Sequence, residues 1–247
     1  MRRQVQKGRN VKATGGRALY GASVGILMLD ARFPRIPGDM GNAASWDFPV
    51  HYRVVRSASP DRVVRHNADG LLELFIAAAR DLVADGVDGI TTNCGFLSLF
   101  QAELAAALPV PVASSSLMQV AMVSRLLGSD RRAGILTISG STLTQEHLSN
   151  ADVPLGTPIG TTEGGAEFTR AILGNELELD VELARRDNVE AALGLQSQNS
   201  DLGAIVLECT NMGPYAADIS QATGLPVFSI NGFITWFQSG LVPRRFD

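Results

Sequence analysis

The sequence predicts an α/β protein of two pseudo-symmetric lobes, each with a parallel sheet, and an active-site cleft between the lobes. Short apolar runs rich in β-branched residues alternate with helical segments, an order typical of parallel sheets flanked by helices. The second half of the chain also repeats the first, which indicates a duplicated unit. At 247 residues the chain is long enough to bury one large core or two smaller ones.

The individual elements follow from length, periodicity and punctuation. The clearest helix is expected over 67–85, because apolar residues recur at i, i+4, i+7 and i+11 from Leu71 and Gly86 supplies a stop. Segments with the length and composition of strands are expected at 22–29, 50–55, 89–93, 110–113, 133–138, 204–207 and 227–230.

The internal repeat rests on three pairs of aligned segments in the same order. Two pairs have an offset of 115 residues and the third has an offset of 109: 87–94 with 202–209, 110–114 with 225–229, and 25–27 with 134–136. The difference fits a loop insertion in the second half. Two copies of one α/β unit normally face each other about a pseudo-twofold axis, and ligands bind at the carboxyl ends of such strands. We therefore expect a shared crevice.

These patterns divide the chain into four parts. We predict a basic, exposed N-terminal arm over 1–17, a first lobe over 18–115, a second lobe over 116–231, and a C-terminal helix and tail over 232–247 that packs back on the first lobe. The arm contains six of the 21 basic residues: Arg2, Arg3, Lys7, Arg9, Lys12 and Arg17.

Charge and hydropathy narrow the class of function. The net charge of −4 favours no nucleic-acid partner. No uninterrupted apolar run approaches the ~18 residues of a membrane span, and the basic arm is not followed by the apolar core of a signal peptide. We expect a cytoplasmic enzyme without a membrane partner.

The chain has two cysteines, Cys94 and Cys209, and they occupy equivalent positions of the repeat. A cysteine in an apolar strand is usually an inert core residue, but this coincidence favours chemistry. Each cysteine ends a strand and precedes a candidate helix, whose N–H groups favour a thiolate and can bind a carboxylate. Two thiols on opposite sides of a carbon atom can remove and return a proton.

No cofactor is expected. The three histidines, His51, His66 and His147, lack the spacing of metal ligands, and the sequence contains neither G-x-G-x-x-G nor a Walker motif. Proton transfer by two thiols requires neither a metal nor a nucleotide.

Three motifs resemble the aspartate/glutamate (hydantoin) racemase superfamily: Thr-Thr-Asn-Cys-Gly-Phe at 91–96, Leu-Glu-Cys-Thr-Asn-Met at 207–212, and Pro-Gly-Asp at 37–39 with Phe-Pro-Val at 48–50. These are cofactor-independent enzymes of two pseudo-symmetric lobes with a cysteine from each. The resemblance covers nearly all of the chain after about Leu19. It implies a homo-oligomer, a dimer or a dimer of dimers.

The resemblance also implies roles for individual residues. Cys94 and Cys209 correspond to the acid/base pair. The residues implied in binding the substrate carboxylate, or counted with them as candidates, are Asn93, Thr210, Ser141, Thr142, Thr92, Asn211 and Asp39. Asn211 departs from the pattern, because glutamate racemases usually carry a histidine or an acidic residue there. Glu208 is adjacent to Cys209, but alternation along a strand favours a structural ion-pair role for it.

The first functional hypothesis is a cofactor-independent racemase of aspartate or glutamate type. The alternative is a carbon–sulfur lyase, because the motifs also resemble algal dimethylsulfoniopropionate lyases, which release dimethyl sulfide and acrylate. A third possibility is an arylmalonate-type decarboxylase or a non-catalytic carboxylate-binding protein. Each of them takes a small carboxylate. The segment 37–42, followed by Trp46, is interpreted as a lid or as a surface loop anchored by Trp46.

Overall fold

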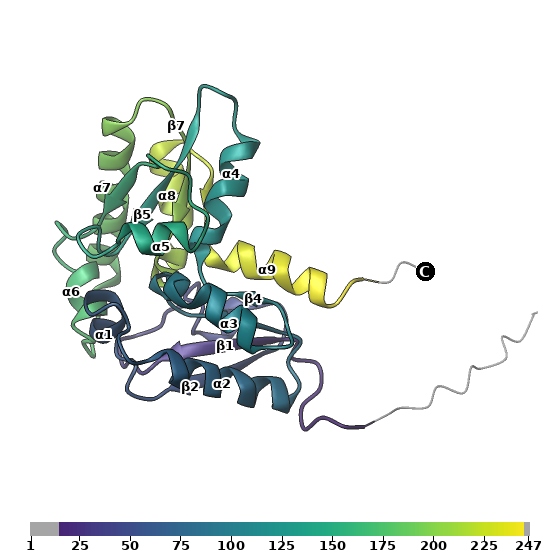
Figure 1. Cartoon of the computed structure of the whole chain (residues 1–247). Coiled ribbons are helices and arrows are strands. Elements are labelled where there is room, and N and C mark those ends of the chain that lie inside the picture. Colours follow the sequence, from purple (N-terminus) through teal and green to yellow (C-terminus); the bar gives the residue numbers. More distant parts are fainter. Residues whose placement is uncertain (1–14, 245–247) are drawn as a thin grey trace, which may run out of the picture.

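The protein is described by a computed structural model that covers residues 15–244; most of the predicted basic arm and the last three residues of the predicted tail lie outside the described residues. Two lobes stand one above the other, and the C-terminal helix projects from between them (Figure 1). Within residues 15–244, no helix has both the length and the apolar character needed to cross a membrane.

The first lobe is built on a parallel sheet of order β2-β1-β3-β4. Its strands are β1 (Val24–Leu29), β2 (Val50–Val55), β3 (Gly89–Thr92) and β4 (Val112–Ala113). The lobe also contains the 3₁₀ helices η1 (Ala43–Ser45) and η2 (Gly95–Phe100) and the helices α1 (Pro60–Arg65), α2 (Leu72–Asp85) and α3 (Gln101–Ala107).

The second lobe repeats this strand order as β6-β5-β7-β8. Its strands are β5 (Arg132–Thr137), β6 (Ile159–Thr161), β7 (Leu202–Leu207) and β8 (Val227–Phe228). Its helices are η3 (Ser116–Gln119), α4 (Val120–Leu126), α5 (Gln145–Ser149), α6 (Phe168–Leu173), α7 (Val181–Gln198), η4 (Thr210–Tyr215) and α8 (Ala216–Thr223). The predicted fold class, two parallel-sheet α/β lobes, is confirmed.

The strand register agrees with the repeat in the sequence. In the first sheet, Gly25 pairs with Ile90 and Ile90 with Val112. In the second sheet, Gly134 pairs with Ile205 and Ile205 with Val227. The two sets of partners differ by the offsets of 109 and 115 residues that align the two halves of the sequence.

Two expected element boundaries need correction, and one strand was missed. The helix predicted from residue 67 begins at Leu72, because Asn67, Ala68 and Gly70 have positive φ values of 50°, 52° and 69° and break the helical path. The strand predicted to end at residue 230 ends at Phe228, and a helix begins there instead. Strand β6 was not predicted, since three residues with a central glycine give no periodic signal.

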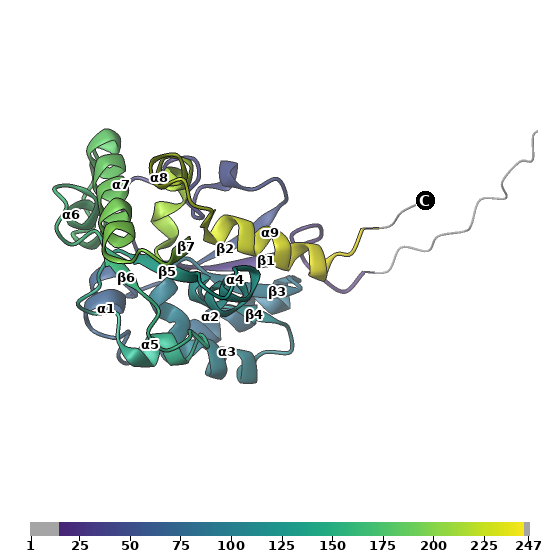
Figure 2. The same ribbon diagram turned by 90° about the horizontal axis from the view of Figure 1, so that it is seen from above.

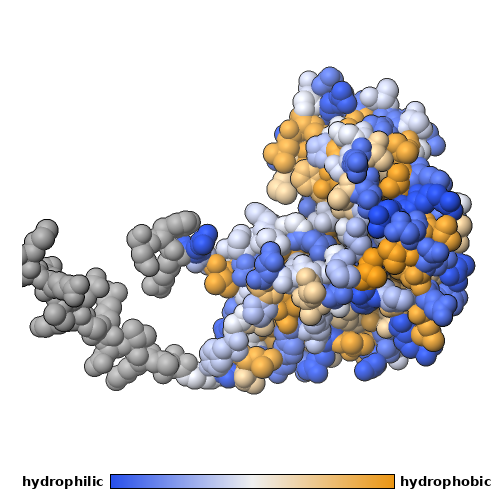
Figure 3. Space-filling view, turned by 180° about the vertical axis from the view of Figure 1, so that it is seen from behind, coloured by the Kyte–Doolittle hydropathy of each residue, from blue (hydrophilic) through white to orange (hydrophobic). Residues whose placement is uncertain are grey.

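The last helix, α9 (Ile230–Leu241), returns from the second lobe to the first sheet. Its buried residues Ile230, Phe233 and Ile234 join a core cluster with Val24 and Ile26 of β1. Its last turn also packs on this sheet, because Phe237 and Leu241 lie against Gly89 of β3, and the helix crosses the edge of the first lobe (Figures 1 and 2). Seen from behind, apolar side chains also gather on the second lobe, the upper one in that view, among polar ones (Figure 3).

Candidate active site

The two cysteines meet where the carboxyl ends of β3 and β7 face each other. Cys94 immediately precedes η2 and Cys209 immediately precedes η4, so each thiol lies between a strand end and the first turn of a helix. Both are free thiols and both are buried. They line one pocket together, with side chains from both lobes around them.

The pocket has a polar end and an apolar wall. The polar end holds the thiols, Glu208 and the candidates Asn93, Thr210 and Asn211, while the wall is formed by Phe33, Pro60, Val64, Ile138, Ile172 and Leu173. The free volume is about 20 Å³, which is room for a single water molecule. The pocket is therefore closed around the thiols in this structure.

Contacts between the lobes fix the two strand ends. The hydroxyl of Thr210 donates a hydrogen bond of 2.6 Å to the backbone oxygen of Asn93. The side-chain oxygen of Asn93 accepts from Leu29 N at 2.7 Å, which leaves its Nδ2 without a hydrogen-bond partner among residues 15–244. This amide lines the pocket and is free to donate to a carboxylate.

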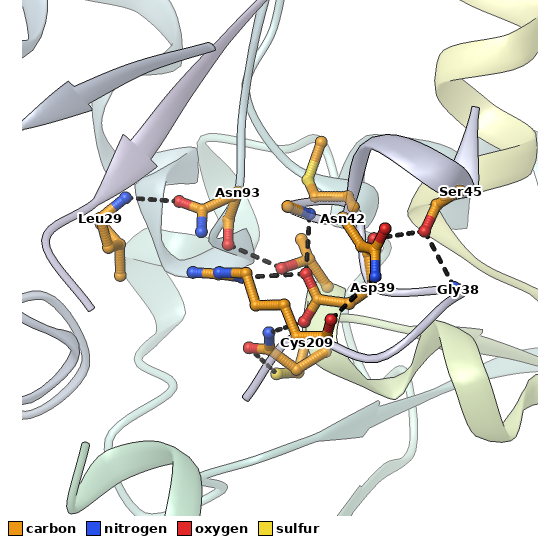
Figure 4. A network of polar contacts seen from close by, with 12 residues as sticks. Leu29, Gly38, Asp39, Asn42, Ser45, Asn93 and Cys209 are labelled. Carbon is orange, nitrogen blue, oxygen red and sulfur yellow. Dashed lines mark hydrogen bonds and ion pairs between the residues drawn. The ribbon is translucent and has the colours of Figure 1, made fainter. Parts of the chain in front are cut away.

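The loop after β1 carries Asp39 into the lobe interface. Asp39 is buried, forms an ion pair with Arg35 at 2.9 Å, and accepts hydrogen bonds from Gly41 N and from Asn211 Nδ2. Gly38 lies so close to Pro214 of η4 that an added Cβ would approach the proline backbone. Figure 4 shows this network, which joins the loop to the residues beside Cys209.

Trp46 anchors the same loop from the other side. Its side chain is buried, and its Nε1 donates to Met40 O at 3.1 Å. The segment 37–42 therefore lies closed against η4, as a lid would, while Trp46 holds it to the core of the first lobe, as expected of an anchored surface loop. Features of both interpretations are present.

The Asp39 carboxylate determines which way the Asn211 amide points. A carboxylate paired with Arg35 only accepts hydrogen bonds, so the Nδ2 of Asn211 must face it. The Oδ1 of Asn211 then faces the other way, and the thiol of Cys209 donates to it at 3.6 Å. An acceptor beside the sulfur stabilises the protonated thiol over the thiolate.

Charges act unequally on the two thiols. Burial raises the pKa of both, and Glu208 raises both further. At Cys94 the pKa is lowered by the N–H groups of Phe96 and Leu97 and by the positive charge of Arg35. At Cys209 only the N–H of Asn211 lowers the pKa, while the charges of Cys94 and Asp39 raise it.

The remaining predicted residues lie outside the pocket lining. Thr92 is fully buried, and its hydroxyl donates to Ser114 O at 2.6 Å, so it supports the end of β3. Ser141 donates to Glu163 and Thr142 donates to Ser139. Substrate binding by Ser141 and Thr142 stays a prediction, because the structure brings neither to the thiols.

Sequence reasoning missed Glu208 as a pocket residue. Its carboxyl group accepts from Thr137 at 2.7 Å and forms no ion pair among residues 15–244, contrary to the expected structural role. β7 ends at Leu207, so Glu208 and Cys209 both lie in the turn into η4, where strand alternation no longer separates neighbours. No group of three or more His, Cys, Asp or Glu residues within 15–244 is arranged to hold a metal ion.

By sequence, the chain is similar to known lyases. No family model matches the chain. A dimethylsulfoniopropionate lyase of Durusdinium sp. clade D is 29% identical over 236 residues, which are 90% of this chain and 75% of that protein. Dimethylsulfoniopropionate lyase 3 of Emiliania huxleyi is 30% identical over 220 residues, 83% of this chain. The chain spans 56% of that protein, little more than half of its length.

By structure, the chain is similar to racemases and to a decarboxylase. Arylmalonate decarboxylase superposes with a TM-score of 0.59 at 17% identity, over 91% of this chain and 94% of that one. A glutamate racemase of Bacillus anthracis superposes with a TM-score of 0.59 at 17% identity, over 89% of this chain and 82% of that one. At this identity the likeness is one of fold.

Proposed function

We propose that this chain, which has the fold of the aspartate/glutamate racemase superfamily, is a carbon–sulfur lyase that cleaves dimethylsulfoniopropionate to dimethyl sulfide and acrylate. The observation that carries the proposal is the unequal environment of the two thiols. Elimination needs one base, whereas racemisation in both directions needs two thiols that exchange the roles of base and acid. The sequence relatives also favour this alternative over the racemase that the sequence first suggested.

Cys94 is the base in this proposal. Two N–H groups at the start of η2 and the charge of Arg35 favour its thiolate. Cys209 is held as a thiol by the Oδ1 of Asn211, whose orientation is fixed by Asp39. A thiol whose proton is bonded to Asn211 Oδ1 does not compete for the substrate proton.

The pocket matches the two ends of the substrate. The Nδ2 of Asn93 is free to donate to the carboxylate at the polar end. The apolar wall, with Phe33 and Leu173 on opposite lobes, suits the methyl groups of the sulfonium. This arrangement holds the carbon next to the carboxylate toward the thiols.

The reaction then balances as a β-elimination. The Cys94 thiolate takes a proton from the carbon next to the carboxylate, and that electron pair forms the new carbon–carbon double bond. The carbon–sulfur bond breaks, and its electron pair leaves with dimethyl sulfide. Acrylate remains, and one proton has moved from the substrate to the enzyme. That proton must reach solvent before the next turnover.

Substrate entry requires the closed pocket to widen. A free volume of about 20 Å³ does not hold the substrate. Helix α1 of the first lobe contacts α6 of the second, and both contribute to the apolar wall. Separation of α1 and α6 opens the wall without disturbing the strand ends that hold the thiols.

The direct test incubates the protein with dimethylsulfoniopropionate in heavy water and follows vinyl protons by NMR and dimethyl sulfide in the headspace. We expect acrylate and dimethyl sulfide in equal amounts, and neither from Cys94→Ala. D- and L-aspartate, D- and L-glutamate and an arylmalonate are tested in parallel. Exchange of the α-proton of an amino acid, or loss of carbon dioxide, without cleavage of the sulfonium would reject the lyase in favour of the alternatives.

A further inference from the structure

Glu208 is a buried carboxyl group in the thiol pocket that the elimination described above does not use. It is 1% exposed and lines the pocket together with both cysteines. Its side chain crosses to the first lobe and lies against Gly95, the residue after Cys94, where an added Cβ would collide with the carboxylate. The carboxyl group is thus packed on the backbone that carries the Cys94 thiol.

The surroundings leave this carboxyl group able to take up a proton near neutrality. Burial raises the pKa of Glu208 to about 7, against the hydrogen bond from Thr137 and the N–H of Ile138, which favour the ionised form. The charged and titratable groups around it are the two thiols, on which its charge acts, and, from the loop, Arg35 and Asp39, which act on the same thiols.

Both thiols need a proton acceptor, because burial raises the pKa of each well above neutrality. Among the residues that line the pocket, Glu208 is the one other titratable side chain. We propose that Glu208 accepts the proton of the Cys94 thiol as the thiolate forms, and later passes the surplus proton to solvent. This inference rests on the proposed function for its role in turnover.

The proton balance explains why a lyase needs such a group. In the first step a proton passes from the Cys94 thiol to the Glu208 carboxylate, which leaves a thiolate and a neutral acid. The thiolate takes the substrate proton, so the enzyme ends with a neutral Cys94 and a neutral Glu208. Loss of one proton from Glu208 to solvent restores the starting state. A racemase returns its proton to the product and accumulates no surplus.

The proposal predicts a characteristic pH dependence of thiol reactivity. In a Cys209→Ala background, Cys94 is the single thiol of the chain, so its rate of alkylation by iodoacetamide reports its thiolate alone. Once Glu208 is ionised, the share of the pair that carries its charge on sulfur is constant, and the thiolate grows again only at a pH where both groups lose their protons. The alkylation rate should therefore rise tenfold per pH unit up to about pH 7 and by much less between pH 7 and 8, which gives a plateau in the profile.

Glu208→Gln removes this plateau. Glutamine keeps an oxygen that accepts from Thr137 but cannot take a proton, so the Cys94 thiolate then grows tenfold per pH unit. Between pH 7 and 8 we expect a rise of about tenfold, against about threefold or less with Glu208 present. Glu190→Gln, an exposed carboxyl group on α7 outside the pocket lining, is the matched control and should retain the plateau.

Thr137→Val provides a second test that retains Glu208. It removes the hydroxyl that stabilises the ionised carboxylate. The inflection of the alkylation profile, the pH at which the rate begins to level off, should therefore move up by about one pH unit. An inflection that survives Glu208→Gln, or that stays in place in Thr137→Val, would overturn the proposal. These measurements use no substrate, so their outcome does not depend on the lyase activity.

Turnover supplies the remaining readout. With dimethylsulfoniopropionate, activity should fall below about pH 7 as Glu208 becomes protonated, and Glu208→Gln should lower kcat by about 100-fold and abolish that acidic limb. Loss of activity above pH 7 instead would mean that the neutral acid is the active form, which contradicts a role as proton acceptor. An enzyme that fails to cleave the sulfonium but keeps the alkylation plateau would reject the substrate and retain the role of Glu208.

Discussion

The two lobes have the same strand order and place a cysteine at the same strand end, yet the residues around the two thiols differ. At the offset of 115 residues, Asn93 corresponds to Glu208 and Gly95 to Thr210. Asn93 O accepts from the Thr210 hydroxyl, and the Glu208 carboxyl group lies against Gly95. The pseudo-symmetry relates these two contacts to each other, because each joins the residue before one cysteine to the residue after the other.

This difference teaches how a symmetric frame becomes a directional site. The duplication brings the two thiols to one pocket, but it does not decide which of them acts as base. The two thiols differ in the residues around them: the glycine after Cys94 leaves room for the Glu208 carboxyl group, whereas the Oδ1 of Asn211 accepts a hydrogen bond from the Cys209 thiol. Elimination is a one-directional proton transfer, and the asymmetry of the surroundings fits it.

Replacing each cysteine tests the asymmetry with the largest expected effect. Cys94→Ala removes the proposed base of the proposed lyase, and we expect kcat for the release of dimethyl sulfide to fall by about 10⁴-fold. Cys209→Ala removes the thiol that bonds to Asn211 Oδ1 and lines the pocket, and we expect a loss of about 10- to 100-fold. Headspace analysis of dimethyl sulfide measures both.

The control for this comparison is the pH dependence of kcat in Cys209→Ala. Cys209→Ala should retain the acidic limb near pH 7 that we attribute to Glu208, because that limb does not involve the second thiol. Equal losses in the two variants, or a larger loss in Cys209→Ala, would show that the surroundings do not separate the roles of the thiols.

Asp39→Asn tests the network that holds Cys209 as a thiol. The variant leaves the Arg35 charge without its carboxylate in a buried position, and we expect a loss of about 3 kcal/mol in the free energy of unfolding. Asp30→Asn is the control, because the Asp30–Arg56 pair is exposed and should contribute less than about 1 kcal/mol. Urea denaturation measures both.

Asp39→Asn should also replace the hydrogen-bond acceptor beside the Cys209 sulfur by a donor. The new amide nitrogen takes the place of the oxygen that faces Asn211, so the Asn211 amide turns and presents its Nδ2 to the sulfur. A donor favours the thiolate, and alkylation of Cys209 should accelerate relative to Cys94, as measured by peptide mass spectrometry. An unchanged ratio would mean that Asn211 does not hold the Cys209 proton.

Most of the fold was predictable because a repeat carries information that single elements lack. The alignment of Gly25 with Gly134 and of Cys94 with Cys209 implies one unit used twice, and the two sheets share that register. The short strand β6 escaped prediction, since its pairing with β5 is determined by the sheet and not by its own three residues.

Site residues that are neighbours of a cysteine in the sequence could be predicted. Contacts between residues of different lobes could not. The positions of Asn93, Thr210 and Asn211 beside the thiols come directly from their motifs. The environment of Glu208 depends on Gly95, which is distant in sequence and is brought to it by the packing of the lobes. Strand alternation treated Glu208 as a neighbour of Cys209 alone and therefore favoured an ion pair that the described residues do not form.

The pH dependence of the free energy of unfolding also tests how Glu208 differs from its counterpart Asn93, which carries no charge. The pKa of Glu208 is raised to about 7 in the folded chain, so between about pH 4.5 and 7 the folded state binds more protons than the unfolded state, and stability falls as pH rises. Glu208→Gln removes this cost. The variant should match the parent near pH 4.5 and exceed it by up to about 3 kcal/mol above pH 7.

This outcome separates a functional carboxyl group from a structural one. A carboxylate that stabilises the fold would make Glu208→Gln less stable above pH 7, with the opposite sign. The buried His147, whose pKa is lowered to about 4 by burial, changes stability equally in both proteins and cancels in the difference. Urea denaturation at pH 4.5, 6 and 8 measures the trend.

The smallest expected effect concerns Thr210, the counterpart of Gly95. Thr210→Val keeps the shape of the side chain and removes the hydroxyl that bonds to Asn93 O, so a buried carbonyl loses this partner. We expect a loss of about 1 to 2 kcal/mol in the free energy of unfolding and a kcat within about threefold of the parent. Thr235→Val, whose exposed hydroxyl bonds within α9, is the control and should change stability by less than about 0.5 kcal/mol. If kcat fell as far as in Glu208→Gln, the two pseudo-symmetric contacts would contribute equally to catalysis, and the division into a contact that holds the lobes and a contact that transfers protons would be wrong.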